Sequence, residues 1–206
     1  MEIKLYYHPK TRAFRVRWLL EELGANYQLQ YVDLFGGEAN SEWYRAIHPH
    51  GCLPAVEIDG RVMIETSAIC HWLTDQFPDR EFAPQHNSPA RLEYTQWMYY
   101  VPATMEPPMW YAFLHSNILP DEQKVPDIIP WCENLYDDVF GVLNRAYENK
   151  NYLIENRFST VDLMIGSMLL WYARQASNYS ELRRVLQDFS QRPAFRRARE
   201  EISHAA

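Results

Sequence analysis

The chain has 206 residues, of which 20 are Lys or Arg and 27 are Asp or Glu, so its formal net charge is −7 at pH 7. An apolar fraction of 47% and a charged fraction of 23% are typical of a globular protein and exclude a disordered or fibrous one. The negative charge argues against nucleic acid or an anionic membrane as the main partner, because both attract clustered positive charge. The longest uncharged apolar run lies within residues 163–173 and is too short to span a membrane.

The three cysteines form an odd and sparse set without metal-ligand spacing. We interpret Cys52, Cys70 and Cys132 as reduced thiols, which predicts a cytoplasmic protein. The two histidines His48 and His50 alone make a poor metal site, so we expect no bound metal.

Strand and helix patterns alternate over the first eighty residues. The expected strands are Ile3–Tyr7, Tyr27–Val32, Ala55–Ile58 and Arg61–Ile64, and the expected helices are Val16–Leu23, Glu42–Ile47 and Ile69–Phe77. Gly24 is placed as a helix stop, and Asp59-Gly60 is the strongest hairpin signal in the chain. The order βαβαββα predicts a mixed sheet with helices on its faces.

A polar, turn-rich stretch at residues 78–89 is the expected linker. Beyond it helical periodicity recurs and no strand pattern is convincing. The sequence therefore predicts an α/β domain at residues 1–80 and an all-helical domain at residues 88–206. Helices in the aromatic-rich part of the second domain must bend or break at its prolines, Pro102, Pro107 and Pro108.

Leu53-Pro54 stands just before an expected strand, where a proline need not donate to the ladder. A cis bond here would turn the Leu53 backbone outward and leave its N–H and C=O free to pair with an extended ligand. The alternative is an ordinary trans turn, because only about 5–6% of X-Pro bonds in folded proteins are cis.

Glu65-Thr66-Ser67 lies between a strand and a helix. The free N–H groups at that helix N-terminus favour a carboxylate, and Glu65 is suited to an ammonium group, so the pair fits an α-amino acid head group. The alternative is plain helix capping by Thr66 or Ser67.

Thr11 lies in the loop between the first strand and the first helix. Its hydroxyl could donate a hydrogen bond to a thiolate and so lower the pKa of that thiol. The alternative is that Thr11 simply caps the helix, and the two interpretations are compatible.

The motifs Tyr-His-Pro-Lys-Thr-Arg-Ala, His-Pro-His-Gly-Cys-Leu-Pro and Ile-Glu-Thr-Ser-Ala-Ile, in this order and spacing, resemble the cytosolic glutathione transferases. The likeness is greatest to bacterial and fungal members that use a Ser or Thr hydroxyl, and it extends over nearly the whole chain. It implies a thioredoxin-like first domain and a homodimer. It also implies that the helical domain supplies a pocket for a hydrophobic electrophile.

The same resemblance assigns roles to residues of the first domain. Leu53 and Pro54 would form the cis-proline pair that binds the cysteinyl backbone of glutathione. Glu65 and Thr66 would hold its γ-glutamyl end, and Thr11 would face the sulfur. Arg12, beside Thr11, is also expected to contact glutathione.

Two departures from the family pattern leave alternatives open. Family members often carry a lysine where this chain has Cys52, so the contact with the glycyl carboxylate is either lost or supplied by His50. Other branches of the family use a tyrosine near the end of the first strand as the thiolate donor. Tyr6 is therefore kept as an alternative to Thr11 as the catalytic hydroxyl.

Two features of the second half are interpreted as structural. Ser159 and Asp162 have the spacing of a capping box, and Asp162 lies on an apolar helix face, so we expect it to be buried and hydrogen-bonded. The arginines near the C-terminus are balanced by Glu200 and Glu201 and are typical of a solvated helix face.

The sequence thus predicts a glutathione transferase that activates the glutathione thiolate for attack on a hydrophobic electrophile, with a role in detoxification. One alternative is a specialised glutathione-dependent etherase, dehalogenase or peroxidase on the same scaffold. Another is a glutathione-transferase-like binding protein without catalysis.

Overall fold

The computed structural model describes residues 1–200 of the chain. Its contacts divide the chain into two compact units. The sheet unit contains residues 1–83 and 189–200, and the helical unit contains residues 84–188. This division differs from the expected one at the C-terminus, because residues 189–200 return to the sheet unit.

The sheet unit has the predicted βαβαββα order, which confirms the thioredoxin-like fold class. Its strands are β1 Ile3–Tyr7, β2 Gln28–Tyr31, β3 Ala55–Ile58 and β4 Arg61–Ile64, and its helices are α1 Ala13–Leu23, η1 Glu38–Asn40, α2 Glu42–Ile47, α3 Thr66–Gln76 and η2 Pro78–Arg80. The sheet order is β2-β1-β3-β4, with β1 parallel to β2 and antiparallel to β3, and with β3 antiparallel to β4. Asp59 and Gly60 form the expected hairpin turn with φ of 46° and 78°.

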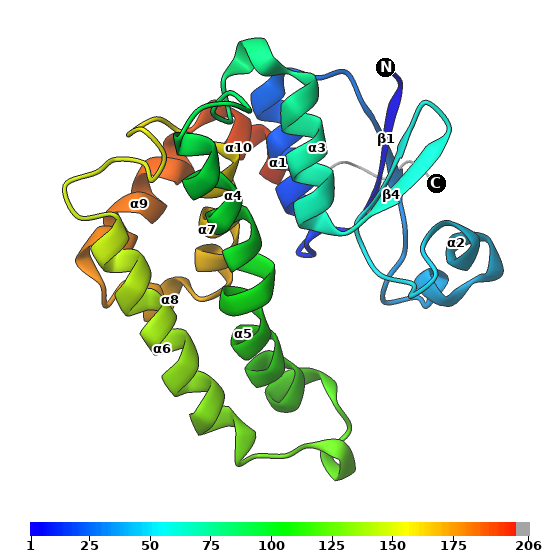
Figure 1. The fold of residues 1–206 in the computed structure, drawn as a ribbon. Coiled ribbons are helices and arrows are strands. Elements are labelled where there is room, and N and C mark those ends of the chain that lie inside the picture. The colour runs from blue at the N-terminus through cyan, green and yellow to red at the C-terminus, as the bar shows by residue number, and fades with distance from the viewer. Residues whose placement is uncertain (201–206) are drawn as a thin grey trace. The chain divides into compact units, whose positions relative to one another are not determined.

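Opposite faces of the sheet are covered by different helices. Helices α1 and α3 lie side by side (Figure 1) and pack on one face, where Tyr7 contacts Arg17 of α1. Tyr6 points to the other face, because neighbouring strand residues alternate, and its ring lies 5.9 Å from that of Tyr44 in α2. The predicted apolar stripe of α1 is fully buried, and Gly24 ends the helix with φ of 64°.

The last described helix, α10 Pro193–Arg199, packs against α1. The Phe195 ring lies 5.0 Å from that of Trp18, centroid to centroid. Arg192 donates to both carboxylate oxygens of Glu22, and Arg197 Nε lies 2.7 Å from a carboxylate oxygen of Glu21. The expectation of a solvated arginine face is correct for Arg197, which is exposed, but it misses the half-buried Arg192 and the partners that α1 supplies to both side chains.

The helical unit contains no strand among its residues, as predicted. Its helices are α4 Ala90–Tyr100, η3 Val101–Met105, α5 Glu106–Phe113, η4 Leu114–Ile118, η5 Asp121–Gln123, α6 Ile128–Ala146, α7 Thr160–Trp171 and α8 Ala173–Ala176, while α9 Ser180–Gln191 crosses into the sheet unit. The prolines do not break the helical path. Pro102 lies within the π-helical turn η3, and Pro107 and Pro108 lie in the first turn of α5.

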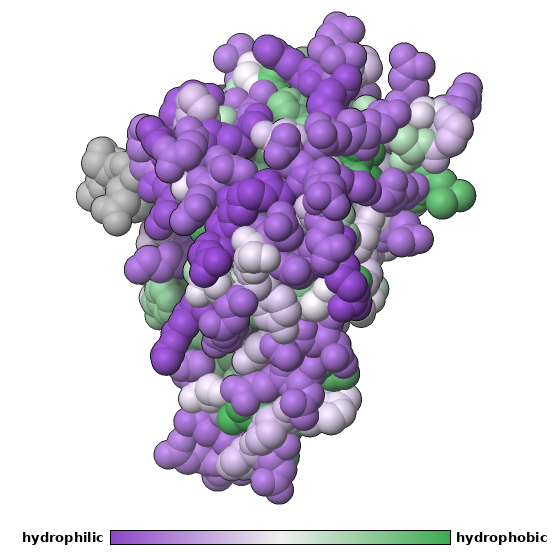
Figure 2. Space-filling view, turned by 90° about the vertical axis from the view of Figure 1, so that its left-hand side faces the viewer, coloured by the Kyte–Doolittle hydropathy of each residue, from purple (hydrophilic) through white to green (hydrophobic). Residues whose placement is uncertain are grey.

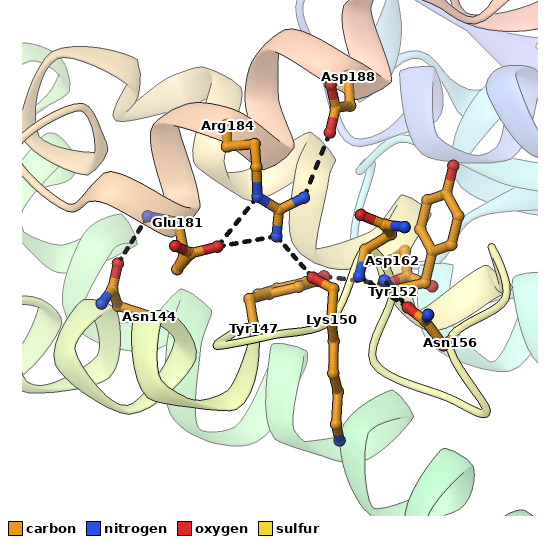
Figure 3. Close-up of polar contacts among 10 residues, drawn as sticks. Asn144, Tyr147, Lys150, Tyr152, Asn156, Asp162, Glu181, Arg184 and Asp188 are labelled. Carbon is orange, nitrogen blue, oxygen red and sulfur yellow. Dashed lines mark hydrogen bonds and ion pairs between the residues drawn. The ribbon is translucent and has the colours of Figure 1, made fainter.

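A buried carboxylate organises the start of α7, as the sequence predicts. Asp162 is 0% exposed and accepts hydrogen bonds from Tyr147, from the Leu153 backbone and from both the backbone and hydroxyl of Ser159. Arg184 and its acidic partners Glu181 and Asp188 lie in the same region (Figure 3), and the Arg184 guanidinium donates to the Lys150 carbonyl. Asp162 is thus a folding residue of the capping box.

No helix within residues 1–200 is long and apolar enough to cross a membrane. The face drawn in Figure 2 is mainly hydrophilic, with its hydrophobic residues in small, separate areas. Scattered apolar residues of this kind are normal on a globular surface, because polar side chains cannot cover it completely.

Asp162→Asn is expected to lower the free energy of unfolding by about 2 kcal/mol, because an amide NH2 would replace an oxygen that accepts two hydrogen bonds from Ser159. Burial raises the pKa of Asp162 to about 6 from an ordinary value of 3.8. The folded protein therefore takes up a proton between about pH 6 and pH 4 that the unfolded chain does not. Denaturant unfolding across this window should show the wild type gaining stability, relative to Asp162→Asn, as the pH falls. A constant difference would contradict the raised pKa.

Candidate functional site

The strand register brings three loops to one edge of the sheet. Tyr6 near the end of β1 pairs with Ala55 at the start of β3, and Ala55 pairs with Ile64 at the end of β4. The loop after β1, the residues before β3 and the residues after β4 therefore leave the sheet at the same edge. These are the segments that carry Thr11, Leu53-Pro54 and Glu65-Thr66.

The Leu53–Pro54 peptide bond is cis. The Leu53 side chain is 7% exposed and so is anchored in the core. Within residues 1–200 neither the Leu53 N–H nor its C=O makes a hydrogen bond. Leu53 therefore offers one donor and one acceptor beside β3, which is what an extended peptide-like ligand needs in order to pair with a strand.

The start of α3 presents free backbone donors. Glu65 precedes the helix with φ of 73° and ψ of 106°, a conformation that is rare for a residue other than glycine. No side chain caps the helix, and among the described residues the N–H groups of Thr66, Ser67 and Ala68 have no partner. The capping alternative is therefore wrong here, and the uncapped N-terminus suits an anion next to the exposed Glu65 carboxylate.

The Thr11 hydroxyl is engaged within its own loop. It donates to the His8 carbonyl at 2.8 Å and accepts from the Ala13 N–H at 3.3 Å, while Lys10 turns the loop with φ of 61°. Arg12, the next residue, precedes the first turn of α1. The N-cap of α1 is Arg12 and no side chain caps the helix, so Thr11 is bonded to its loop and to the first helical N–H. A thiolate could accept the hydrogen bond of the Thr11 hydroxyl only by displacing the His8 carbonyl.

Tyr6 has a structural partner of its own. Its hydroxyl donates to Glu57 at 2.9 Å, and Glu57 also pairs with Lys4 at 3.2 Å. Burial and the adjacent Glu57 carboxylate raise the pKa of Tyr6 to about 12. The Tyr6 ring packs against Tyr44 of α2, so Tyr6 lies on the face of the sheet next to α2. Its hydroxyl hydrogen bond is already donated to Glu57.

The turn that precedes Leu53 contains side chains whose part sequence reasoning missed. His50 and Cys52 are exposed, as expected for residues beside a ligand. His48, considered in the sequence only as a metal ligand, is 5% exposed and lies within the turn. The signal that could have found it is its place at the start of a His-Pro-His-Gly turn. In the described part of the chain, no group of three His, Cys, Asp or Glu side chains could hold a metal ion.

Comparison with known proteins agrees with this arrangement. Residues 11–76 match the family model for the glutathione S-transferase N-terminal domain. The glutathione S-transferase GstA of Escherichia coli O157:H7 is 26% identical over 196 residues, which cover 93% of this chain and 94% of that protein. A maleylacetoacetate isomerase of Pseudomonas aeruginosa is 38% identical over 80 residues, 37% of this chain and 38% of the isomerase.

Solved structures show the same fold. The glutathione transferase homologue of Lodderomyces elongisporus, determined with two GSH per subunit, has a TM-score of 0.87 and 20% identity. The match covers 96% of this chain and 97% of that one. The chain is thus similar to a glutathione S-transferase N-terminal domain over residues 11–76 and to a glutathione S-transferase over most of its length, and it shares the fold of the solved structure.

Tyr6→Phe is expected to lower the free energy of unfolding by about 1 kcal/mol, because Glu57 loses a hydrogen-bond donor. Urea unfolding at neutral pH measures this loss. Glu57→Gln is the matched control, since its amide oxygen still accepts from Tyr6. In a chain that already carries Glu57→Ala, Tyr6→Phe should lower the free energy of unfolding only a little. A full loss in that double variant would show that the hydroxyl has another partner.

Proposed function

We propose that this protein binds glutathione along the edge of the sheet unit and activates its thiol for attack on a hydrophobic electrophile. The proposal rests on three segments with unpaired or strained backbone that lie at one edge of the sheet. They are the free Leu53 backbone, the uncapped start of α3 and the Thr11 loop. Each matches a different part of one tripeptide: an extended backbone, an α-amino acid head group and a thiol.

The Leu53 N–H and C=O would pair with the cysteinyl residue of glutathione, next to Pro54. The γ-glutamyl carboxylate would accept from the Thr66 hydroxyl and from the free N–H groups of α3, and the ammonium group would face Glu65. His50 would contact the glycyl carboxylate, and Arg12 would add positive charge near the bound anion. The neighbouring structure solved with GSH supports glutathione as the ligand.

Thr11 would act on the sulfur. When glutathione loses its thiol proton to solvent, the Thr11 hydroxyl would turn from the His8 carbonyl to the thiolate and donate to it. A hydrogen bond to a charged acceptor is stronger than one to a carbonyl, so the exchange is favourable only while the sulfur is ionised. The thiolate then forms a bond to an electrophilic carbon, and the leaving group departs with the bonding electron pair.

We place the protein among the transferases that use a Ser or Thr hydroxyl. The support is the engagement of the rival Tyr6 hydroxyl by Glu57, which leaves Thr11 as the hydroxyl of the loop that precedes α1. The corresponding biological role is detoxification in the cytoplasm. The protein would act as a homodimer, and the helical unit would supply the electrophile pocket.

A glutathione-dependent isomerisation is a second candidate. The local 38% identity to a maleylacetoacetate isomerase favours it over the etherase, dehalogenase and peroxidase alternatives, although that match spans only part of both chains. Assays with an aryl halide, an aryl ether, an organic hydroperoxide and a cis-configured unsaturated diketo acid would separate these activities. A protein that binds glutathione but turns over none of these substrates would fit the non-catalytic alternative.

Thr11→Ala is expected to raise the pKa of bound glutathione by about one, which corresponds to about 1.4 kcal/mol of lost thiolate stabilisation. The affinity for glutathione should change little, and kcat/KM near neutral pH should fall about tenfold. Ultraviolet difference titration of the thiolate and steady-state kinetics measure both effects. Thr11→Ser is the matched control and should retain the lowered pKa. If Thr11→Ala keeps the wild-type thiol pKa, Thr11 is not the donor and Tyr6→Phe becomes the next variant.

Glu65→Gln is expected to weaken glutathione binding about tenfold, because a charge-assisted contact with the ammonium group is lost. At saturating glutathione kcat should stay close to that of the wild type. Calorimetric titration gives the affinity, and Glu57→Gln serves as the control carboxylate within the sheet. Equal affinities for Glu65→Gln and wild type would remove Glu65 from the site.

A further inference from the structure

We infer that His48 is a positioning residue for glutathione, because its ring and backbone hold the turn of residues 48–52 that presents the Leu53 backbone at the site. The inference rests on the proposed function, since it assigns His48 a role in the same site. It concerns a side chain that the proposed chemistry does not use.

The backbone N–H groups of His50 and Gly51 both donate to His48. The His48 carbonyl accepts from the Gly51 N–H at 2.8 Å, and His48 Nδ1 accepts from the His50 N–H at 3.3 Å. The His48 N–H itself donates to the Tyr44 carbonyl at 2.8 Å, which ties the turn to the end of α2. His48 therefore accepts two hydrogen bonds within the turn and anchors the turn to α2.

Helix α2 holds two carbonyls of the turn. The fully buried Tyr44 ring stacks on the His48 ring at 6.4 Å, and its hydroxyl donates to the Cys52 carbonyl at 2.7 Å. Arg45 Nη1 donates to the Pro49 carbonyl at 2.8 Å. Because the backbone on either side of His50 is held in this way, its N–H has a fixed direction, toward His48 Nδ1.

The turn has little freedom to adopt another shape. Gly51 has φ of 60°, and a Cβ added to it would lie 2.5 Å from the Ala39 carbonyl oxygen. The conformation of Gly51 sets the path of the backbone through the next two residues, Cys52 and Leu53. A change in the His48 ring is thus transmitted to the backbone donor and acceptor of Leu53.

The contact requires a neutral His48 with its proton on Nε2, since Nδ1 must accept. Burial lowers the pKa of His48 below its ordinary value, and its interaction with His50 acts in the same direction. The groups that face it are Tyr44 and Arg45 from α2, His50 from the turn, and Glu65 before α3. The Glu65 carboxylate and a hydrogen bond of His48 to the backbone act in the opposite direction. Protonation at low pH would convert Nδ1 into a donor that opposes the His50 N–H.

Two variants of the full chain separate this role from general packing. In His48→Asn the side-chain oxygen stands where Nδ1 stood and still accepts, but it does not titrate. In His48→Leu the ring is replaced by an apolar side chain, and the His50 N–H loses its acceptor. The affinity for glutathione is measured by calorimetry between about pH 7.5 and pH 5.5.

Protonation of the bound thiolate weakens binding in every variant as the pH falls, so the wild type should lose more affinity than His48→Asn does. The extra loss should appear below pH 6.5, the ordinary pKa of histidine. His48→Leu should bind about tenfold more weakly at every pH, which corresponds to about 1.4 kcal/mol. His115→Asn is the matched control, because His115 Nδ1 accepts from the Val125 N–H at 3.1 Å in the helical unit, and it should retain the wild-type pH profile.

A wild-type pH profile in His48→Asn, or wild-type affinity in His48→Leu, would overturn the inference while leaving the proposed function in place. If the wild type binds no glutathione at any pH measured, the proposed function and the binding role of His48 are both overturned. Hydrogen exchange of the His50 amide gives a readout without ligand. The amide should be protected in wild type and His48→Asn near neutral pH, and equal protection in His48→Leu, or in the wild type at low pH, would contradict the contact.

Discussion

The antiparallel register of β1, β3 and β4 is the constraint on which the site depends. Tyr6 opposite Ala55 and Ala55 opposite Ile64 leave no choice about which loops share an edge. A slip of one residue would turn every side chain of a strand to the opposite face, so the half-buried Lys4 and Glu57 would move to the face that buries apolar residues such as Leu5 and Val56. The burial that fixes the fold therefore also fixes the geometry of the three loops.

The edge is distinguished by what it leaves unpaired. In most of a folded chain buried backbone groups are hydrogen-bonded, yet here the Leu53 backbone and the first N–H groups of α3 lack partners within the described residues. In the neighbouring turn of residues 48–52, by contrast, the His50 and Gly51 N–H groups both donate to His48. Unpaired backbone groups at the positions that a tripeptide would occupy are readily explained by a ligand that pairs with them.

Local patterns predicted the sheet unit well because its signals act over a few residues. The Asp59-Gly60 turn and the buried stripe of α1 needed only neighbours in sequence, and so did the capping box at Asp162 in the helical unit. What could not be predicted involves partners far apart in the chain. Arg192 finds Glu22 across 170 positions and Tyr6 finds Glu57 across 51, and no periodicity encodes such pairs. The same reason explains why Thr11 and Tyr6 could not be separated without a structure.

The two hydroxyls considered for catalysis differ in how costly it is to redirect their protons. Tyr6 donates to a carboxylate, so transfer of its hydrogen bond to a thiolate exchanges one anionic acceptor for another and leaves Glu57 with one donor fewer. Thr11 donates to a neutral carbonyl, and turning toward a thiolate gains a charged acceptor for the loss of an uncharged one. In the proposed mechanism the exchange would therefore be favourable only for Thr11, and only once the sulfur has ionised. The Thr11 hydroxyl would bond to its own loop when no anion is present and to the thiolate when one forms, and so would distinguish a thiolate from a thiol.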